Sequence, residues 1–188
     1  MRALALALVV AGAVSGCGGS SSGAPRTLPA VTPSVSPTAA ASAAPVVDVP
    51  VAARAADSAG AEAFARFVYA QIERGFTARN PALVSAISAP TCAACSRFIS
   101  SISSLRDQGG RIENFRFRIV SAVAPAVADN AVRVDVTWAL PNPAIWYDTK
   151  GKVVLRDGPY SRVDDEVSLR RRGESWVVTD MTTMRRRR

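Results

Sequence analysis

The chain has 188 residues, of which 48% are hydrophobic, and it contains no histidine. This length predicts one domain plus a tail, with enough apolar residues for a packed core. The absence of histidine excludes Ser-His-Asp and Cys-His catalysis and removes the commonest metal ligand. The formal net charge is +8, and four of the positive charges are Arg185, Arg186, Arg187 and Arg188, so the charge belongs mainly to one end of the chain.

The first seventeen residues have the pattern of a secretory signal. One positive charge at Arg2 precedes an uncharged, mostly apolar run from Ala3 to Gly16, and Cys17 follows directly. The run is shorter than the roughly 18 residues that a membrane-spanning helix needs. A Cys placed directly after Ser15-Gly16 resembles the lipobox of bacterial lipoproteins. In that family the Cys receives a diacylglyceryl thioether, becomes the new N-terminus and is often acylated again.

This resemblance implies a signal peptide at residues 1–16 and a lipid anchor at Cys17. We therefore expect an extracytoplasmic protein held on the outer face of the cell membrane. The alternative is an ordinary secreted protein with a chance Cys at its cleavage site.

Residues 17–56 predict a disordered tether that follows the lipidated Cys17. The segment is rich in Ala, Ser and Thr and is punctuated by proline. Thr27 to Val47 is uncharged and long enough to imitate a spanning helix, but its prolines argue against that interpretation. Such a composition favours an extended, partly polyproline-like chain that holds a domain away from the bilayer.

Residues 57–184 predict the folded domain, which begins with helices. Ser58 is expected to cap a helix that runs to about Arg79 and carries its apolar residues at helical spacing. Asn80-Pro81 then predicts the start of a short second helix. A third helix follows, and Gly109-Gly110 is expected to end it.

After Gly110 the apolar period changes from 3.6 to 2, which predicts antiparallel strands with one buried and one wet face. Alternating residues occur around Phe115 to Ile119, Val132 to Leu140, Val163 to Leu169 and Trp176 to Val178, and Val153 to Leu155 is expected to add a strand. Pro141-Asn142-Pro143 predicts a loop. Helices followed by strands indicate an α+β fold, with N-terminal helices packed on a curved antiparallel sheet.

This order of elements resembles the cystatin-like or nuclear-transport-factor-like roll. More narrowly, four features resemble a family of actinobacterial lipoproteins that carry a domain of unknown function, number 6318. They are Gly60-Ala61 with Ala63-Phe64, Cys92-Ala93-Ala94-Cys95, Gly109-Gly110-Arg111-Ile112 and Trp176-Val177-Val178. The resemblance covers roughly residues 57–181 and implies a fold and a location, but no activity.

Cys92 and Cys95 are the only thiols left outside the cell if Cys17 is lipidated. An even pair in an oxidising compartment is expected to form a disulfide, here a small structural staple at a helix start. The functional alternative is thiol-disulfide exchange, because a helix N-terminus lowers a thiol pKa. A zinc site would need two further Cys or His ligands. We therefore expect no metal and no cofactor.

The acidic run Asp164-Asp165-Glu166 could suggest calcium, but alternation with Val163 and Val167 places Asp164 and Glu166 on the wet face. Ketosteroid-isomerase-like enzymes of the same fold use a buried Asp with a Tyr. Tyrosines are present at 69, 147 and 160. Because the visible acids are expected on polar faces, we do not expect that chemistry here.

Trp138, Trp146 and Tyr147 could line the mouth of a concave sheet, although core packing of Trp138 and loop packing of the other two is the favoured explanation. The basic tail Arg185 to Arg188 could bind anionic lipid headgroups or teichoic acids. Nucleic acid is not an expected partner, because no basic residues interleave with aromatic ones.

The sequence as a whole therefore predicts a membrane-anchored envelope lipoprotein. Its roll domain is expected to bind a ligand or an unidentified protein partner without catalysis. The alternative is an extracytoplasmic enzyme of thiol-disulfide exchange or isomerase type.

Overall fold

The computed structural model describes residues 47–187 of the chain. The predicted signal peptide, Cys17, the tether up to residue 46 and Arg188 lie outside the described residues. Within the described part, no helix has the length and apolar character needed to cross a membrane.

The helices come first, as predicted. A short 3₁₀ helix, η1 (Val51–Arg54), precedes α1 (Ser58–Ala78), α2 (Ala82–Ser85) and α3 (Ala93–Asp107). The cap of α1 is Asp57 rather than the expected Ser58, because the Asp57 carboxylate accepts a hydrogen bond from the Gly60 N–H at 2.8 Å. The Ser58 hydroxyl instead donates to the Pro125 carbonyl at 2.7 Å, which ties the helix start to a loop after β2 (Arg118–Val123).

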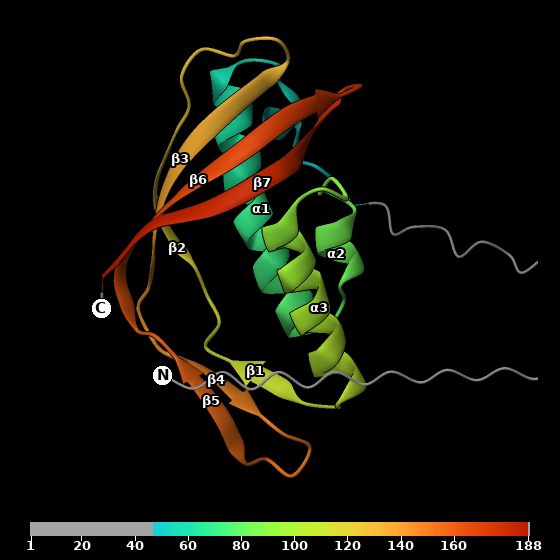
Figure 1. Ribbon diagram of the computed structural model, residues 1–188, viewed down its shortest axis with the longest axis vertical. Helices are drawn as coiled ribbons and strands as arrows, with labels where there is room; N and C mark the ends of the chain where they lie inside the picture. Colours follow the sequence, from blue (N-terminus) through green and yellow to red (C-terminus); the bar gives the residue numbers. More distant parts are fainter. Residues whose placement is uncertain (1–46, 188) are drawn as a thin grey trace, which may run out of the picture. The chain divides into compact units, whose positions relative to one another are not determined.

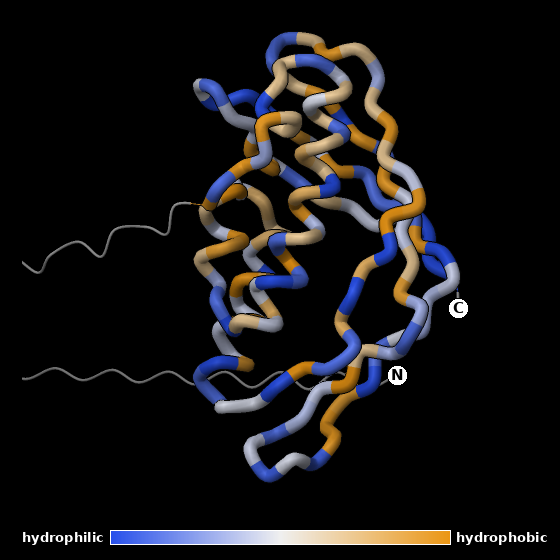
Figure 2. Tube along the Cα trace, turned by 180° about the vertical axis from the view of Figure 1, so that it is seen from behind, coloured by the Kyte–Doolittle hydropathy of each residue, from blue (hydrophilic) through white to orange (hydrophobic). Residues whose placement is uncertain are grey.

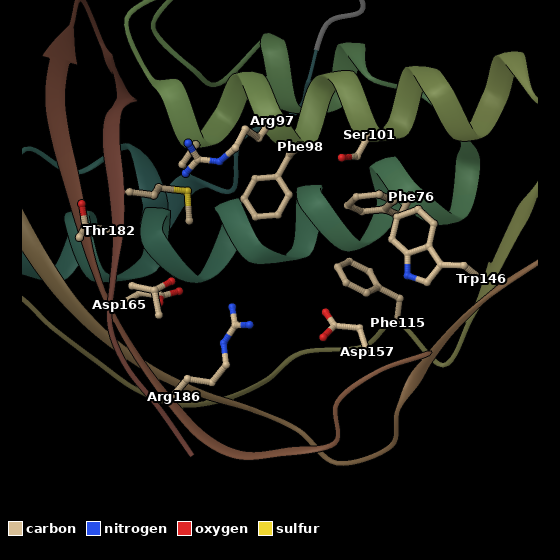
Figure 3. Close-up of a pocket in the computed structure, with 13 residues that line it drawn as sticks. Phe76, Arg97, Phe98, Ser101, Phe115, Trp146, Asp157, Asp165, Thr182 and Arg186 are labelled. Atoms are coloured by element: carbon tan, nitrogen blue, oxygen red, sulfur yellow. The ribbon is translucent and has the colours of Figure 1, made fainter. Parts of the chain in front are cut away.

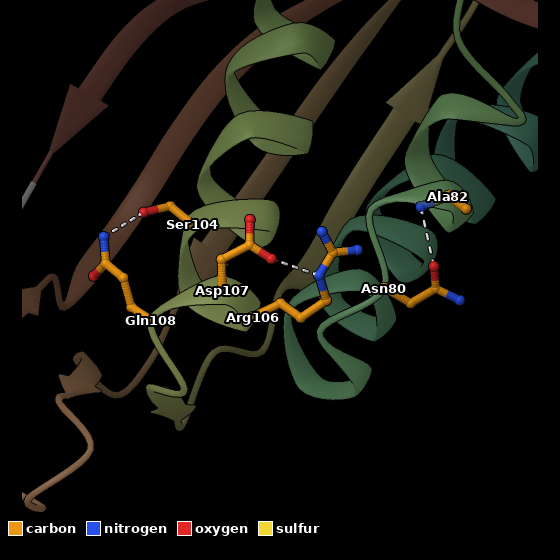
Figure 4. Close-up of polar contacts among 6 residues, drawn as sticks. All are labelled: Asn80, Ala82, Ser104, Arg106, Asp107 and Gln108. Atoms are coloured by element: carbon orange, nitrogen blue, oxygen red, sulfur yellow. Dashed lines mark hydrogen bonds and ion pairs between the residues drawn. The ribbon is translucent and has the colours of Figure 1, made fainter.

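Hydrogen bonds confirm the expected start of α2, which Figure 4 shows, and the expected end of α3. The Asn80 side chain accepts a hydrogen bond from the Ala82 N–H at 3.1 Å at the start of α2. After α3, Gly109 adopts a positive φ of 65°, and the Gly110 N–H donates to the Leu105 carbonyl at 3.0 Å.

The strands form two antiparallel sheets rather than the single curved sheet that we expected. The larger sheet has the order β2-β3-β6-β7 and the smaller one the order β1-β4-β5. The remaining bounds are β1 (Arg111–Glu113), β3 (Ala131–Leu140), β4 (Ala144–Tyr147), β5 (Val153–Asp157), β6 (Tyr160–Arg172) and β7 (Ser175–Arg187). Figure 1 shows the helices on one side of the four-stranded sheet, with the smaller sheet beyond its end.

The predicted α+β roll is therefore confirmed, with a divided sheet. The division occurs at the predicted loop Pro141-Asn142-Pro143, which separates β3 from β4. Phe115 and Phe117 were expected in a strand, but they lie in the irregular segment between β1 and β2. Their side chains still pack against the core, so the alternation predicted burial correctly without predicting a ladder.

The core forms where α1 packs on the larger sheet. Buried residues recur along α1 at helical spacing, as Phe64, Val68 and Ile72 show. Alternate residues of β3 and β6 face them, and the apolar and polar residues alternate along these strands in Figure 2. Burial of one face of each element gives the layered arrangement that positions the site.

The domain begins earlier than the predicted boundary at residue 57. Ala53 in η1 is fully buried, and the Trp176 indole N–H donates to the Ala55 carbonyl at 2.8 Å. Arg171 donates a further hydrogen bond to the Arg54 carbonyl at 2.7 Å. Small residues allow this segment to pack closely against α1, since a side chain at Gly60 would collide with Ala55. Residues 47–56 thus belong to the fold rather than to the tether.

The predicted basic tail is also part of the fold up to residue 187. Arg185, Arg186 and Arg187 continue β7 and pair with Asp164, Val163 and Arg162 of β6. Strand pairing therefore sends neighbouring arginines to opposite faces of the sheet.

Candidate functional site

A cavity of about 470 Å³ lies between α3, the end of α1, the smaller sheet and the ends of β6 and β7. In Figure 3, Phe76, Phe115 and Trp146 lie at one end of the cavity together with Asp157, and Asp165 and Arg97 lie at the other, which we call the charged end. The lining residues are Phe76, Ala94, Arg97, Phe98, Ser101, Phe115, Trp146, Asp157, Asp165, Met181, Thr182, Thr183 and Arg186.

Four aromatic side chains from four segments form the apolar wall of the cavity. Phe76 on α1 lies at the centre, and its ring centroid is 4.7 Å from Phe115, 5.3 Å from Trp146 and 6.4 Å from Phe98. All three pairs have edge-to-face geometry, which favours a fixed arrangement of the rings. We call Phe76, Phe98, Phe115 and Trp146 the aromatic wall.

The charged end contains a buried carboxylate, Asp165 on β6, which is only 7% exposed. Its Oδ2 accepts hydrogen bonds from the Tyr69 hydroxyl of α1 and from the Trp138 indole N–H of β3, both at 2.6 Å. Its Oδ1 is buried and has no hydrogen-bond partner among the described residues. A buried polar atom without a partner is rare in folded proteins and often marks a functional position.

This position corrects our expectation that the acids lie on polar faces. Asp164 does lie on the outer face, where Thr137 and Arg162 bind it at 2.8 and 2.9 Å, and Glu166 lies beside Arg133 at 3.6 Å. Asp165 faces inward, because residues two apart on a strand share a face and Val163 and Val167 are both fully buried. The sequence contained the information needed to predict this inward position, since Asp165 lies two residues from Val163 and two from Val167 and so shares their face of the strand.

Burial and the negative charge of Asp165 act together on Tyr69. Three effects raise the pKa of the Tyr69 hydroxyl well above 10.0. The largest is desolvation by burial, followed by the negative charge of Asp165 and then by the hydrogen bond between Tyr69 and Asp165. Tyr69 therefore remains a neutral hydrogen-bond donor over the whole physiological range.

A second group of polar side chains surrounds Arg186, which also lines the cavity. The Arg186 guanidinium stacks over the Tyr160 ring at 4.7 Å and donates to the Tyr160 hydroxyl at 3.3 Å. The Tyr160 hydroxyl in turn donates to Asp157. Arg97 on α3 also lines the cavity, but its side chain is exposed to solvent and has no ion-pair partner in the described part of the chain.

The three aromatic residues considered from the sequence occupy three different places. Trp146 belongs to the aromatic wall of the cavity. Trp138 is buried and serves as a donor to Asp165. Tyr147 points elsewhere, since its hydroxyl donates to Glu113 at 3.0 Å and Arg111 stacks over its ring at 4.0 Å.

Cys92 and Cys95 form a disulfide at the start of α3. The two residues are 0% and 2% exposed, so an attacking thiolate cannot reach the sulfur atoms without local opening. The pair fixes the first turn of α3, from which Ala94, Arg97 and Phe98 face the cavity. Among residues 47–187, no group of three or more Cys, Asp or Glu is placed to hold a metal ion.

Comparisons with known proteins add only distant structural neighbours, since no family model and no curated protein matches the chain. The intermembrane space region of the chloroplast protein ARC6 has a TM-score of 0.43 at 7% identity, covering 65% of this chain and 95% of that chain. Aln2 from a Streptomyces species has a TM-score of 0.42 at 11% identity, with 64% and 87% covered. The beta subunit of benzoate 1,2-dioxygenase from Burkholderia mallei has a TM-score of 0.42 at 9% identity, with 63% and 86% covered. Similarities this low transfer no activity to the chain, and the lipoprotein family resemblance stays a prediction.

Replacing both Cys92 and Cys95 with Ser should lower the free energy of unfolding by about 2 kcal/mol, the loop-closure value for so short a loop. Urea unfolding of the variant and of the oxidised protein measures the difference. Exposed Ser100→Ala on the same helix is the control and should change stability by no more than about 0.5 kcal/mol. An unchanged midpoint in the double variant would contradict the role of the disulfide as a staple.

The raised pKa of Tyr69 predicts a loss of stability in alkali. Above pH 10 the unfolded chain releases the Tyr69 proton while the folded chain keeps it, so the free energy of unfolding should fall as pH rises. Below pH 10 this contribution is fully present. Tyr69→Phe should flatten the decline above about pH 10, measured by urea unfolding at each pH. Equal slopes for both proteins would show that Tyr69 titrates normally.

Proposed function

We propose that this chain is a membrane-anchored envelope lipoprotein whose roll domain binds a small ligand in the cavity beside Asp165. The observation that supports this proposal best is the combination of an apolar wall and a buried carboxylate oxygen without a partner among the described residues. A cavity of about 470 Å³ lies within the usual range for ligand sites. Such sites are mostly apolar and contain few polar groups, which fix the orientation of the ligand.

The anchoring part of the proposal depends on the sequence. The apolar run before Cys17 and the resemblance to lipoboxes support lipidation, and the resemblance to actinobacterial lipoproteins with an uncharacterised domain supports the same location. The arginines on the outer face of the sheet support contact with an anionic lipid or envelope polymer. Arg185 pairs with Asp164 across the strands and Arg187 pairs with Arg162, so positive charge gathers at this end of the sheet.

The enzyme alternatives differ in their support. The burial of Cys92 and Cys95 argues against thiol-disulfide exchange. The partly unpaired Asp165 favours an isomerase-type enzyme, in which Oδ1 would take a proton from a carbon atom of the substrate. Recovery of bound ligand after incubation in deuterium oxide separates the two functions, because binding alone leaves its carbon-bound hydrogens unexchanged.

Filling the cavity should abolish binding. Ala94 lines the cavity and is 7% exposed, so Ala94→Leu should weaken binding of the uncharged fluorophore N-phenyl-1-naphthylamine at least about tenfold by occupying its space. Fluorescence titration measures the affinity. The matched control is Ala93→Leu, one residue earlier on the same helix and exposed, which should bind as the unaltered protein does. Equal affinities for the two variants would place the fluorophore elsewhere.

Removal of the lipid attachment site should release the protein from the membrane. In Cys17→Ala the thioether cannot form, so the protein should remain unprocessed or appear in the soluble fraction. Fractionation and intact-mass measurement distinguish these products. A processed Cys17→Ala protein that stays in the membrane fraction would contradict the lipid anchor.

A further inference from the structure

We infer that Asp165 makes the cavity selective for organic cations, in particular for small molecules that carry a protonated amine on an apolar, aromatic body. This inference rests on the proposed ligand-binding function and specifies the chemical class of the ligand. Four observations carry it.

The first observation is the charge balance around Asp165. Both groups that hydrogen-bond to Oδ2, the Tyr69 hydroxyl and the Trp138 indole N–H, are uncharged donors. Of the ion pairs in the described part of the chain, none includes Asp165. A buried carboxylate without a positive partner is costly, so a ligand that brings a positive charge gains more than a neutral ligand does.

The second observation is the direction in which the carboxylate can still bind. Oδ2 is occupied by two donors from α1 and β3, which hold the carboxylate in place. Oδ1 has no partner within the described residues, and Asp165 lines the cavity. One buried acceptor oxygen of a cavity-lining carboxylate thus has no donor, and a charged N–H group of a ligand that reached it would form a hydrogen bond about twice as strong as a neutral one.

The third observation is the aromatic wall. In Figure 3, Phe76, Phe115 and Trp146 lie at the other end of the cavity from Asp165, with Phe98 between them. The four rings supply an apolar surface for the body of the ligand. Aromatic rings also attract cations through their negative faces, so the wall favours the same charge as Asp165. An anionic ligand would be repelled both by the Asp165 carboxylate and by the negative faces of the rings.

The fourth observation concerns the two arginines of the lining, which would oppose a cation if their charges acted inside the cavity. Arg186 is exposed, and its guanidinium is engaged by Tyr160, whose hydroxyl also donates to Asp157. Arg97 is exposed on α3, where water and salt screen its charge. Asp165 acts in a buried environment with a lower effective dielectric constant, so its field dominates at the inner end.

The test compares three probes of similar shape and different charge: 2-phenylethylamine, 2-phenylethanol and 3-phenylpropanoate. Their affinities for the full chain in detergent are measured by calorimetry at neutral pH. We expect the amine to bind at least about tenfold more tightly than the alcohol, because the ammonium brings a positive charge next to the buried carboxylate and the hydroxyl does not. The carboxylate should bind most weakly.

Asp165→Asn should remove the preference for the amine over the alcohol. The amide oxygen can still accept from Tyr69 and Trp138, so the inner end keeps its shape. Asp164→Asn, which changes the neighbouring acid on the outer face, is the matched control and should retain the preference. If Asp165→Asn does not fold, the affinities of the unaltered chain for the three probes still test whether the cavity prefers a cation.

Two kinds of failure are distinguishable. Equal or tighter binding of the alcohol or the carboxylate overturns the inference, as does an Asp165→Asn variant that still prefers the amine. The inference is also overturned if no phenyl probe binds while N-phenyl-1-naphthylamine occupies the cavity, but the proposed function then stands. If that fluorophore does not bind either, both the proposed function and the inference are wrong.

Discussion

The hydrogen bonds that Asp165 accepts join one helix to two strands. Tyr69 belongs to α1, Trp138 to β3 and Asp165 to β6, so a single carboxylate oxygen fixes the distance between the helical layer and the larger sheet. Phe117 packs between the two donors, with ring centroids 5.2 Å from Tyr69 and 4.9 Å from Trp138. Because a buried polar group tolerates little misplacement, these contacts hold the layers in register more strictly than apolar packing would. The same carboxylate supplies the polar end of the cavity, so the fold and the site depend on one group.

The cavity exists because the strands do not continue as one sheet. β3 and β4 are separated by a proline-containing loop, and β1 and β2 by the irregular segment with Phe115 and Phe117. A continuous sheet would place its side chains directly against the helices and fill the space between the layers. The divided sheet instead leaves a gap, which the aromatic side chains line but do not fill. Phe115 and Phe117 contact each other at 4.9 Å and connect the aromatic wall to the groups that hold Asp165.

The sequence predicted those features that depend on local periodicity. The stripe along α1, the start of α2 at Asn80 and the alternation in β3 and β6 all identify their elements, because side-chain spacing follows directly from backbone geometry. The division of the sheet depends on pairing between distant segments, such as β1 with β4, which periodicity does not contain. The position of Asp165 was predicted wrongly for a different reason. Its neighbours Asp164 and Glu166 are polar and face outward, and three consecutive acids suggested a polar face although Asp165 lies two residues from the apolar positions on either side. The strand that includes Arg185 to Arg187 was missed because four arginines have no apolar pattern.

The length of β7 separates the two ends of the domain. At one end Trp176 holds the segment where the described chain begins, through its hydrogen bond to Ala55. Ten residues later on the same strand, Arg186 lines the cavity, which at about 3.3 Å per residue is a distance of about 30 Å. The contact with the first described segment and the Arg186 part of the cavity lining thus lie near opposite ends of one strand. A substitution that loosens the contact between Trp176 and Ala55 therefore acts at the other end of the same strand from Arg186.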